Sequence, residues 1–294
     1  MATTCNQLNC GFERRTSRLA TGILRRVRHC DPRAMQLTAL GVILGFGALL
    51  HDPYLLPLQA LFSLAAALTT HMVGNRLTGQ PVKSVRSPLI TALSVSILLR
   101  ADSLWVHPAA AFAAIGSKYL IRTRDRHLFN PSCFGVTLAL AVLPGVWISP
   151  GQWGSRIAVA GWLAVLGSMV VSRAARADIS TGFLASYFAM LAARVIALGQ
   201  PLGVLAHQMS GGAIVLFAFF MLSDPRTIPA TRRGRLAHAG IVAAAIYALK
   251  FRFQLTSAPL WALMITAPMV PLWDWLWPQS DAESTGEELR WRRI

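Results

Sequence analysis

Stretches of mostly apolar residues alternate with short polar stretches through most of the chain. The apolar stretches are about 14 to 20 residues long and recur from about Leu37 to Leu276. Since about 20 apolar residues span a bilayer as a helix, the pattern predicts an all-α polytopic membrane protein. We place ten transmembrane segments, at residues 35–50, 54–72, 88–99, 104–121, 131–148, 155–172, 180–198, 207–222, 236–250 and 257–276.

Composition supports this class of protein. The chain is 54% hydrophobic and only 14% charged, whereas soluble domains carry about 25% charged residues. Lys and Arg number 28 against 12 Asp and Glu, and most of the basic residues lie in every second connection between segments. The positive-inside rule explains this asymmetry and puts both termini in the cytoplasm, so we expect membrane lipids, and no nucleic acid, as partners.

The ends of the chain are polar. The first 34 residues carry seven arginines before the first apolar segment, and no small-residue cleavage site follows them. We therefore expect a basic cytoplasmic tail (1–34) and a retained first span rather than a signal peptide. The Glu-rich residues 277–294 form a second cytoplasmic tail.

Two stretches of similar design suggest an internal repeat. Residues 87–102 (SPLITALSVSILLRAD) and 210–225 (SGGAIVLFAFFMLSDP) both open with Ser and a helix-breaking residue, continue with apolar residues and reach a carboxylate. Repeats of five spans each must have opposite orientations in the membrane. We expect two inverted five-helix repeats, residues 35–148 and 155–276.

Segments 3 and 8 hold corresponding places in the two halves and are both short. About 12 to 14 apolar residues give roughly 20 Å of helix, less than a hydrocarbon core of ~30 Å. We expect short broken helices completed by non-helical backbone, which is tolerated only inside protein or beside water. Such pairs frame central sites, so the candidate transport path comprises Ser87, Thr91, Ser210, Gly211 and Gly212.

Several polar residues lie at segment ends. Asn130-Pro131 fits a helix N-cap followed by the first helical residue, and such a terminus also attracts an anion or an electron-rich ring. His127 lies three residues earlier. Lys118 and Arg122 either extend to the interface or bind a phosphate. The turn Ser223-Asp224-Pro225 either caps its helix at the surface or faces the site.

Catalytic and metal-binding motifs give little signal. The chain has no paired carboxylates, H-E-x-x-H motif, phosphate-binding Gly loop or nucleophile elbow. Four cysteines form no C-x-x-C pair, and Cys133, in the first turn of segment 5, is a weak candidate for an iron–sulfur ligand because clusters usually need four thiolates. We assign no catalytic residue and expect no metal site.

Four motifs resemble a known membrane family. SPLITALSVSILL is similar to a short "TGLLLAL"-type helix, GSKYLIR…HLFNPSCFG to a "GK…FNP" region, FMLSDPRTIPATRRGRL to "TDP…P…GRL", and APMVPLWD to a "PLID" end. Together they resemble the RnfD/NqrB family, whose members are membrane subunits of the Rnf electron-transport complex and of the Na+-translocating NADH:quinone reductase. The chain looks like a short, divergent relative.

The resemblance implies an integral subunit in the bacterial inner membrane that passes electrons through flavin, in some systems coupled to Na+ or H+ movement, beside other membrane or redox subunits. Established members attach FMN to Thr in an S-G-A-T type motif, which the corresponding loop here (LPGVWISPGQWGSR) lacks; the nearest Ser-Thr pair is Ser180-Thr181. We therefore expect any FMN or riboflavin to be noncovalent. Its candidate contacts are Lys118, His127, Asn130, Pro131, Ser223, Asp224 and Pro225.

Two other functions also fit broken helices in inverted repeats. One is a cofactor-free transporter or channel, and the other is a scaffold subunit that has lost its cofactor. Some shorter relatives are associated with secondary-metabolite biosynthesis or export. No nicotinamide site is evident, so the chain is at most one subunit of a redox-driven, ion-translocating oxidoreductase.

Overall fold

A computed structural model describes residues 31–51, 55–79, 81, 84–123, 126–148, 157–173 and 176–279. The first half of the chain contains α2 (Pro32–Phe46), a π-helical turn (Gly47–His51), α3 (Pro57–Leu77), α4 (Arg86–Leu98), β1 (Arg100–Ala101), α5 (Val106–Leu120), β2 (Arg122–Thr123), β3 (Arg126–His127), α6 (Pro131–Val142) and β4 (Val146–Trp147). The second half contains α7 (Ile157–Arg173), α8 (Ala177–Ala197), α9 (Leu202–Met209), α10 (Gly212–Leu216), the π-helical η2 (Phe217–Met221), α11 (Arg232–Phe251), α12 (Ala258–Thr266), the 3₁₀ turn η3 (Ala267–Met269) and α13 (Val270–Leu276).

Each predicted segment overlaps a helix, and three segments contain more than one helical element. Segment 1 comprises α2 and the π-helical turn Gly47–His51. Segment 8 comprises α9, α10 and η2, and segment 10 comprises α12, η3 and α13. The expectation of an all-helical protein is confirmed for the described residues, whose strands are two residues each and pair as β1 with β4 and β2 with β3.

The prediction for the end of segment 5 was too long. The helix α6 ends at Val142 because Leu143 takes an extended conformation, and Gly145, with φ of +64°, then makes a turn. A left-handed conformation of this kind favours glycine. The chain next forms β4, which pairs with β1, the strand that directly follows the short helix α4.

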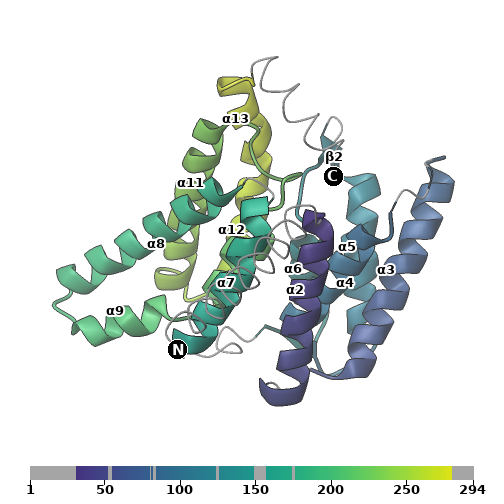
Figure 1. Cartoon of the computed structure of the whole chain (residues 1–294), viewed down its shortest axis with the longest axis horizontal. Helices are drawn as coiled ribbons and strands as arrows, with labels where there is room; N and C mark the ends of the chain where they lie inside the picture. The colour runs from purple at the N-terminus through teal and green to yellow at the C-terminus, as the bar shows by residue number, and fades with distance from the viewer. Residues whose placement is uncertain are drawn as a thin grey trace, which may run out of the picture.

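The two halves pack their helices in the same order. In the first half α3 contacts α5, α5 contacts α6, and α2 contacts α4; in the second half α8 contacts α11, α11 contacts α12, and α7 contacts α10. Figure 1 shows the first half, purple to blue, on the right and the second half, teal to yellow, on the left. Across the middle, α2 contacts α7 and α6 contacts α12.

Few of the helices are long enough to cross a membrane alone. Among the described residues two are long and apolar enough, Pro32–Leu49 and Ala177–Ala197. A third span results if the bent pair Leu202–Met209 and Gly212–Met221 counts as one. The protein is therefore a multi-helix membrane protein, and the ten crossings stay a prediction.

A glycine allows α5 and α6 to approach closely. A Cβ atom at Gly135 would lie 2.3 Å from the Ala110 carbonyl oxygen and 2.7 Å from the Ala114 Cβ. Small residues permit this close backbone contact between membrane helices. The contact fixes the N-terminal part of α6, where Asn130 lies, against α5, which carries Lys118.

Candidate functional site

Three of the predicted site residues meet at one end of α4 and α5. The ammonium of Lys118 donates to the Ser87 hydroxyl and to the Thr91 hydroxyl, both at 3.0 Å. These partners are neutral, so the charge of Lys118 is hydrogen-bonded without being neutralised. Ser87 and Thr91, predicted for the transport path, therefore contact a residue predicted for cofactor binding.

Asn130 joins the two halves of the chain. Its side-chain oxygen accepts hydrogen bonds from the Cys133 backbone N–H at 3.1 Å and the Ser132 hydroxyl at 2.8 Å, so the predicted N-cap of α6 is confirmed. Its amide nitrogen donates to the Met221 carbonyl at 3.2 Å and to the Asp224 carboxylate at 3.4 Å. Pro131 is buried as the first residue of α6.

The Asp224 carboxylate forms hydrogen bonds both within its own turn and with Asn130 of the other half of the chain. One oxygen accepts from the Arg226 backbone N–H at 3.1 Å and stabilises the turn after η2. The other oxygen accepts from Asn130. Ser223 donates to the Phe219 carbonyl at 2.5 Å, which completes the end of the π-helix, and Pro225 follows in the turn.

His127 lies beside these charges on the β2–β3 hairpin. Burial lowers the pKa of His127; the Asp224 carboxylate opposes the change, and Lys118, Arg226 and Arg122 add to it. A lowered pKa means that the imidazole is neutral at pH 7. The hairpin thus brings a neutral ring to a site with several cations.

Two arginines that the sequence did not single out complete the cationic environment. Arg33 lies in the first turn of α2, and Arg226 lies in the turn after η2. The charges of Asp224, Arg226 and Arg33 all act on Lys118. Arg33 is held near α4 because the neighbouring Asp31 accepts a hydrogen bond from the Arg33 backbone and forms an ion pair with Arg86.

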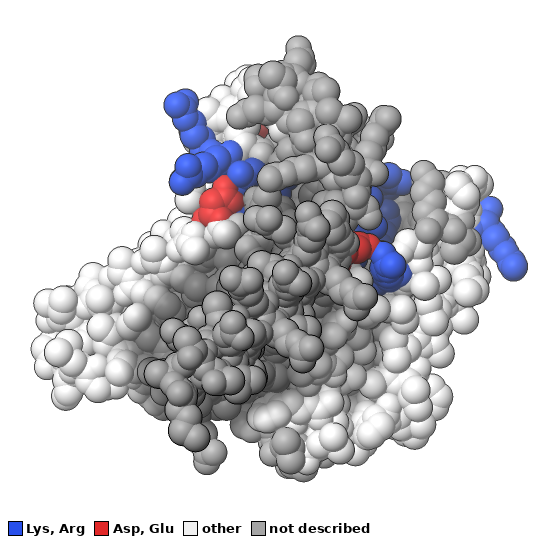
Figure 2. Space-filling view, viewed as in Figure 1, with Lys and Arg blue, Asp and Glu red and all other residues white. Residues whose placement is uncertain are grey.

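Many basic residues lie toward one end of the molecule, although Arg100, Arg194, Lys250 and Arg252 lie at the other ends of α4, α8 and α11. On the face in Figure 2 the blue side chains of described residues lie in the upper half of the view, and the described surface below them is white. This distribution agrees with the basic connections in the sequence. The candidate site lies between elements whose connections carry these charges, and the prediction that this end faces the cytoplasm rests on the positive-inside rule.

The other predicted path residues lie at a helix break. Ser210 and Gly211 separate α9 from α10, and the two helices are bent by 46°. Ser210 is buried and donates to the His207 carbonyl at 3.0 Å, while Gly212 begins α10. Among the described residues no hydrogen bond connects these residues with Ser87 or Thr91.

Cys133 is buried at the contact between α6 and α12. Its thiol lies 3.3 Å from the Leu260 carbonyl and 3.9 Å from the Thr137 hydroxyl. No group of three His, Cys, Asp or Glu side chains able to hold a metal occurs within the described residues. In the described part of the chain Cys133 therefore donates a hydrogen bond across the contact between α6 and α12.

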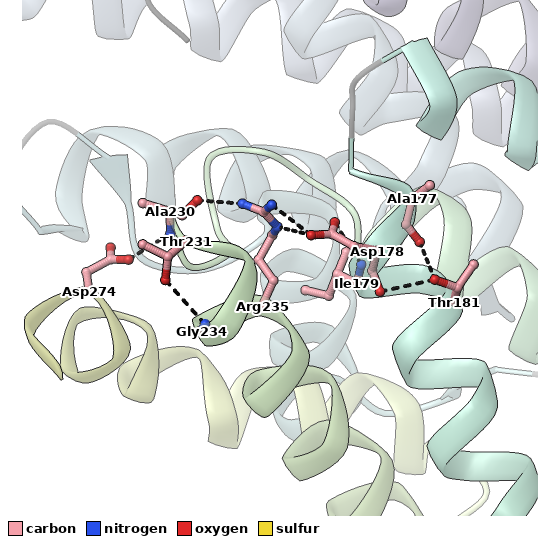
Figure 3. Close-up of polar contacts among 9 residues, drawn as sticks. All are labelled: Ala177, Asp178, Ile179, Thr181, Ala230, Thr231, Gly234, Arg235 and Asp274. Atoms are coloured by element: carbon pink, nitrogen blue, oxygen red, sulfur yellow. Dashed lines mark hydrogen bonds and ion pairs between the residues drawn. The ribbon is translucent and has the colours of Figure 1, made fainter. Parts of the chain in front are cut away.

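A second polar network supports the segment after Asp224. Arg235 on α11 binds the Asp178 carboxylate of α8 at 2.7 Å and also donates to the Ala230 carbonyl (Figure 3). The Ala230 N–H donates to Asp274 on α13 at 2.7 Å, and Arg126 lies 3.8 Å from the same carboxylate. Asp274 had drawn attention only through the motif PLWD, and Asp178 had not been predicted.

These features define a class: an all-helical, multi-helix membrane protein with a broken helix and a basic polar site assembled from both halves of the chain. Residues 146–282 match the model of the NQR2, RnfD, RnfE family, a family of membrane subunits of ion-translocating redox complexes, so the resemblance is confirmed for that region of the chain. The match contains the motifs SDPRTIPATRRGRL and PLWD. Members of the family bind covalent FMN and work in complexes with other subunits. No curated protein matches the chain.

Proposed function

We propose that the protein is an electron-transferring membrane subunit that holds a flavin noncovalently among Lys118, Asn130 and Asp224. One observation carries the proposal: residues from the two family-like motifs, "FNP" and "SDP", are hydrogen-bonded to each other through Asn130 and Asp224. The match of residues 146–282 to the family supports electron passage through the membrane as part of this proposal, with coupling to Na+ or H+ movement as in some systems of the family.

The donor set around this pair suits a flavin. Lys118 has a third N–H beyond its two hydroxyl partners. His127, Arg33 and Arg226 are close enough to act electrostatically on the same group of charges. These groups would bind the carbonyl oxygens, ring nitrogens or phosphate of the cofactor and fix its orientation. When bound, a flavin supplies the electron transfer.

The hydroxyl groups near the start of α8 support a noncovalent arrangement. Ser180 is fully buried and donates to the Ala218 carbonyl at 2.6 Å. Thr181 donates back to the Ala177 carbonyl of its own helix at 2.8 Å. Among the described residues, neither hydroxyl forms a hydrogen bond with Lys118 or Asn130. Residues 149–156 of the loop that corresponds to the family's attachment site lie outside the described residues.

The matching order of helix contacts supports two inverted repeats. The helix pairs α3–α5 and α8–α11 correspond, as do α5–α6 and α11–α12. The contacts α2–α7 and α6–α12 join corresponding helices of the two halves, as a two-fold pseudosymmetry requires. We therefore keep residues 35–148 and 155–276 as the two repeats, flanked by polar tails at 1–34 and 277–294.

The helix break favours a second candidate function. A bend of 46° between α9 and α10, at Ser210-Gly211, is typical of the discontinuous helices that line substrate paths in transporters. A cofactor-free transporter or channel would use this break without any flavin.

The absorbance of the purified protein tests the first proposal. The protein, in mild detergent, should absorb between about 350 and 550 nm as isolated or after flavin is added, and denaturation should release the flavin. A fluorescent band on a denaturing gel would instead indicate covalent attachment. A protein that binds no added flavin, yet gives ion or solute flux in proteoliposomes without an electron donor, would contradict the proposal and support the transporter.

A further inference from the structure

We infer that Arg194 and Lys250 form a binding site for the phosphate of an anionic phospholipid, at the ends of α8 and α11 that the sequence predicts outside the cytoplasm. The inference goes beyond the proposed function, because neither residue belongs to the candidate flavin site. The two helices pack against each other (Figure 1), and the Asp178–Arg235 ion pair joins their first turns. Arg194 and Lys250 lie in their last turns.

Both cations lie over one aromatic ring. The guanidinium carbon of Arg194 is 4.4 Å from the centroid of the Phe251 ring, and the ammonium nitrogen of Lys250 is 5.5 Å from the same centroid. The Tyr247 ring packs against Phe251, with the two centroids 4.9 Å apart. The two positive charges are therefore separated by no more than about one Debye length, roughly 10 Å, and they repel each other.

No carboxylate neutralises these two cations in the part of the chain that the structure describes. The ion pairs there belong to Arg86, Arg126 and Arg235. Lys250 also donates to the Tyr187 hydroxyl at 3.5 Å, which is a neutral partner. A ring and a hydroxyl orient a cation but leave its charge in place. The positive-inside rule does not account for this charge, because it lies at the helix ends predicted outside.

The direction of the helices puts these cations at the depth of lipid phosphates. Side chains on a helix lean toward its N-terminus, so cations in the last turns of α8 and α11 lean back from the water toward the bilayer. Apolar side chains near them face outward, with exposed fractions of 73% for Ile196 and 65% for Phe253. Long cationic side chains near the ends of membrane helices lie at the interface. The anion within reach there is a phospholipid phosphate.

A phosphodiester with a net negative charge suits this pair. Arginine binds phosphate through two parallel hydrogen bonds, and lysine binds it as a point charge. Arg252, the exposed C-cap residue of α11, adds a third cation two positions after Lys250. Phosphatidylglycerol carries a net negative charge, whereas the phosphate of phosphatidylcholine is neutralised by its own quaternary ammonium. The site should therefore select the anionic lipid.

The test measures which lipid lies beside the site. In a background without native cysteines, Phe253→Cys carries a bimane label, and the protein is reconstituted into vesicles of phosphatidylglycerol and phosphatidylcholine in which one of the two lipids is brominated. Quenching should show phosphatidylglycerol enriched next to the label by about 5-fold or more, because each nearby Lys or Arg contributes roughly 5-fold. The same label on Ile265→Cys, where the side chain is 60% exposed on α12, should be quenched equally by both lipids.

Variants locate the site. Arg194→Gln and Lys250→Gln should each reduce the enrichment of phosphatidylglycerol next to the Phe253→Cys label roughly 5-fold. Arg232→Gln and Arg233→Gln are the matched controls, because each removes the same charge from an exposed position in the first turn of α11. Both controls should keep the full enrichment.

Four results would overturn the inference. Equal quenching by both lipids at the Phe253→Cys label, with both cations in place, would show that no anionic lipid is selected. An equal loss in the controls would mean that the total charge of the protein attracts the lipid. Loss of the enrichment on addition of soluble glycerol phosphate would assign the site to a free phosphate, and its loss on addition of a polyglutamate peptide would assign the site to an acidic protein segment. None of these results depends on whether the protein binds flavin.

Discussion

At the scale of single residues, the site depends on side chains whose charges are hydrogen-bonded but not neutralised. Lys118 has two hydroxyl partners, and Asp224 has an amide and a backbone N–H as its partners. Hydrogen bonds of this kind keep both charged groups oriented without joining them in an ion pair. The ammonium and the carboxylate therefore remain available to a ligand.

Lys118→Met should weaken flavin binding roughly 10- to 100-fold, because a charge-assisted hydrogen bond contributes about 1.5–3 kcal/mol. Fluorescence titration measures this effect. Lys250→Met is the matched control, because Lys250 lies in the last turn of α11 as Lys118 lies in the last turn of α5, and among the described residues it donates to the Tyr187 hydroxyl at 3.5 Å and lies over the Phe251 ring. An equal loss of affinity in both variants would argue against a specific role for Lys118.

Asn130→Asp should retain the helix cap but destabilise the contact with Asp224, because two carboxylates would then face each other. We expect a loss of about 1–3 kcal/mol in stability. Adding Asp224→Asn to this variant should restore a donor–acceptor pair and recover most of the loss. Thermal unfolding in detergent measures all three proteins, and a double variant no more stable than the Asn130→Asp variant would mean that the contact contributes little.

At the scale of elements, the positions of the helices depend on close backbone contacts and on one buried ion pair. Gly135 lets α6 approach α5, and the Asp178–Arg235 pair joins α8 to α11 (Figure 3). Both contacts lie next to site-bearing elements: the first next to Asn130, and the second next to the loop that carries Asp224 and Arg226. Changes at these contacts should displace whole elements.

Gly135→Ala should lower stability by roughly 1–3 kcal/mol, because the added methyl group would lie 2.3 Å from the Ala110 carbonyl oxygen. Gly240→Ala is the matched control: no atom lies within 4 Å of its added Cβ, and alanine favours the helix. Thermal unfolding in detergent compares the two. Equal stability of the two variants would mean that α5 and α6 separate at little cost.

Asp178→Asn should lower stability by roughly 3 kcal/mol, because it leaves the buried charge of Arg235 with the Ala230 carbonyl as a partner but without a counter-charge. The exposed fractions of the two side chains are only 10% for Arg235 and 15% for Asp178. Asp31→Asn affects a more open pair, with Arg86 47% exposed, and should cost less than about 1 kcal/mol. Chemical denaturation in detergent measures both, and the reverse order would contradict the roles given to these pairs.

At the scale of the whole molecule, the positions of the helices could be predicted from the sequence better than the contacts between them. Apolar periodicity and length located each helical segment, and the Asn130-Pro131 pair identified the start of α6 because helix capping is local. The contribution of Arg33 was missed because it depends on α2 packing against α4, which no local pattern records. The motif PLWD likewise marked Asp274 without indicating its partner, because its carboxylate accepts from the Ala230 N–H, 44 residues away in the sequence.

The predicted topology can be tested by labelling introduced cysteines. In a background without native cysteines, Ser103→Cys and Gln200→Cys should react with a membrane-impermeant maleimide added to intact spheroplasts, because they lie in the connections predicted to be outside. Thr78→Cys and Arg232→Cys should react only after lysis. All four residues are exposed in the structure. Labelling of all four from one side would contradict the inverted repeat.

The bond between Asn130 and Asp224 also has a consequence for the order of events during synthesis. Its two residues are 94 positions apart, so a ribosome that adds about 5–20 residues per second needs roughly 5–20 seconds to supply the second after the first. The side-chain oxygen of Asn130 needs no such delay, because Ser132 and Cys133 are already beside it. We therefore expect α6 to form early. The side-chain amide nitrogen of Asn130 gains its partners only after the second half of the chain is made, so the site is complete only when both halves have been inserted.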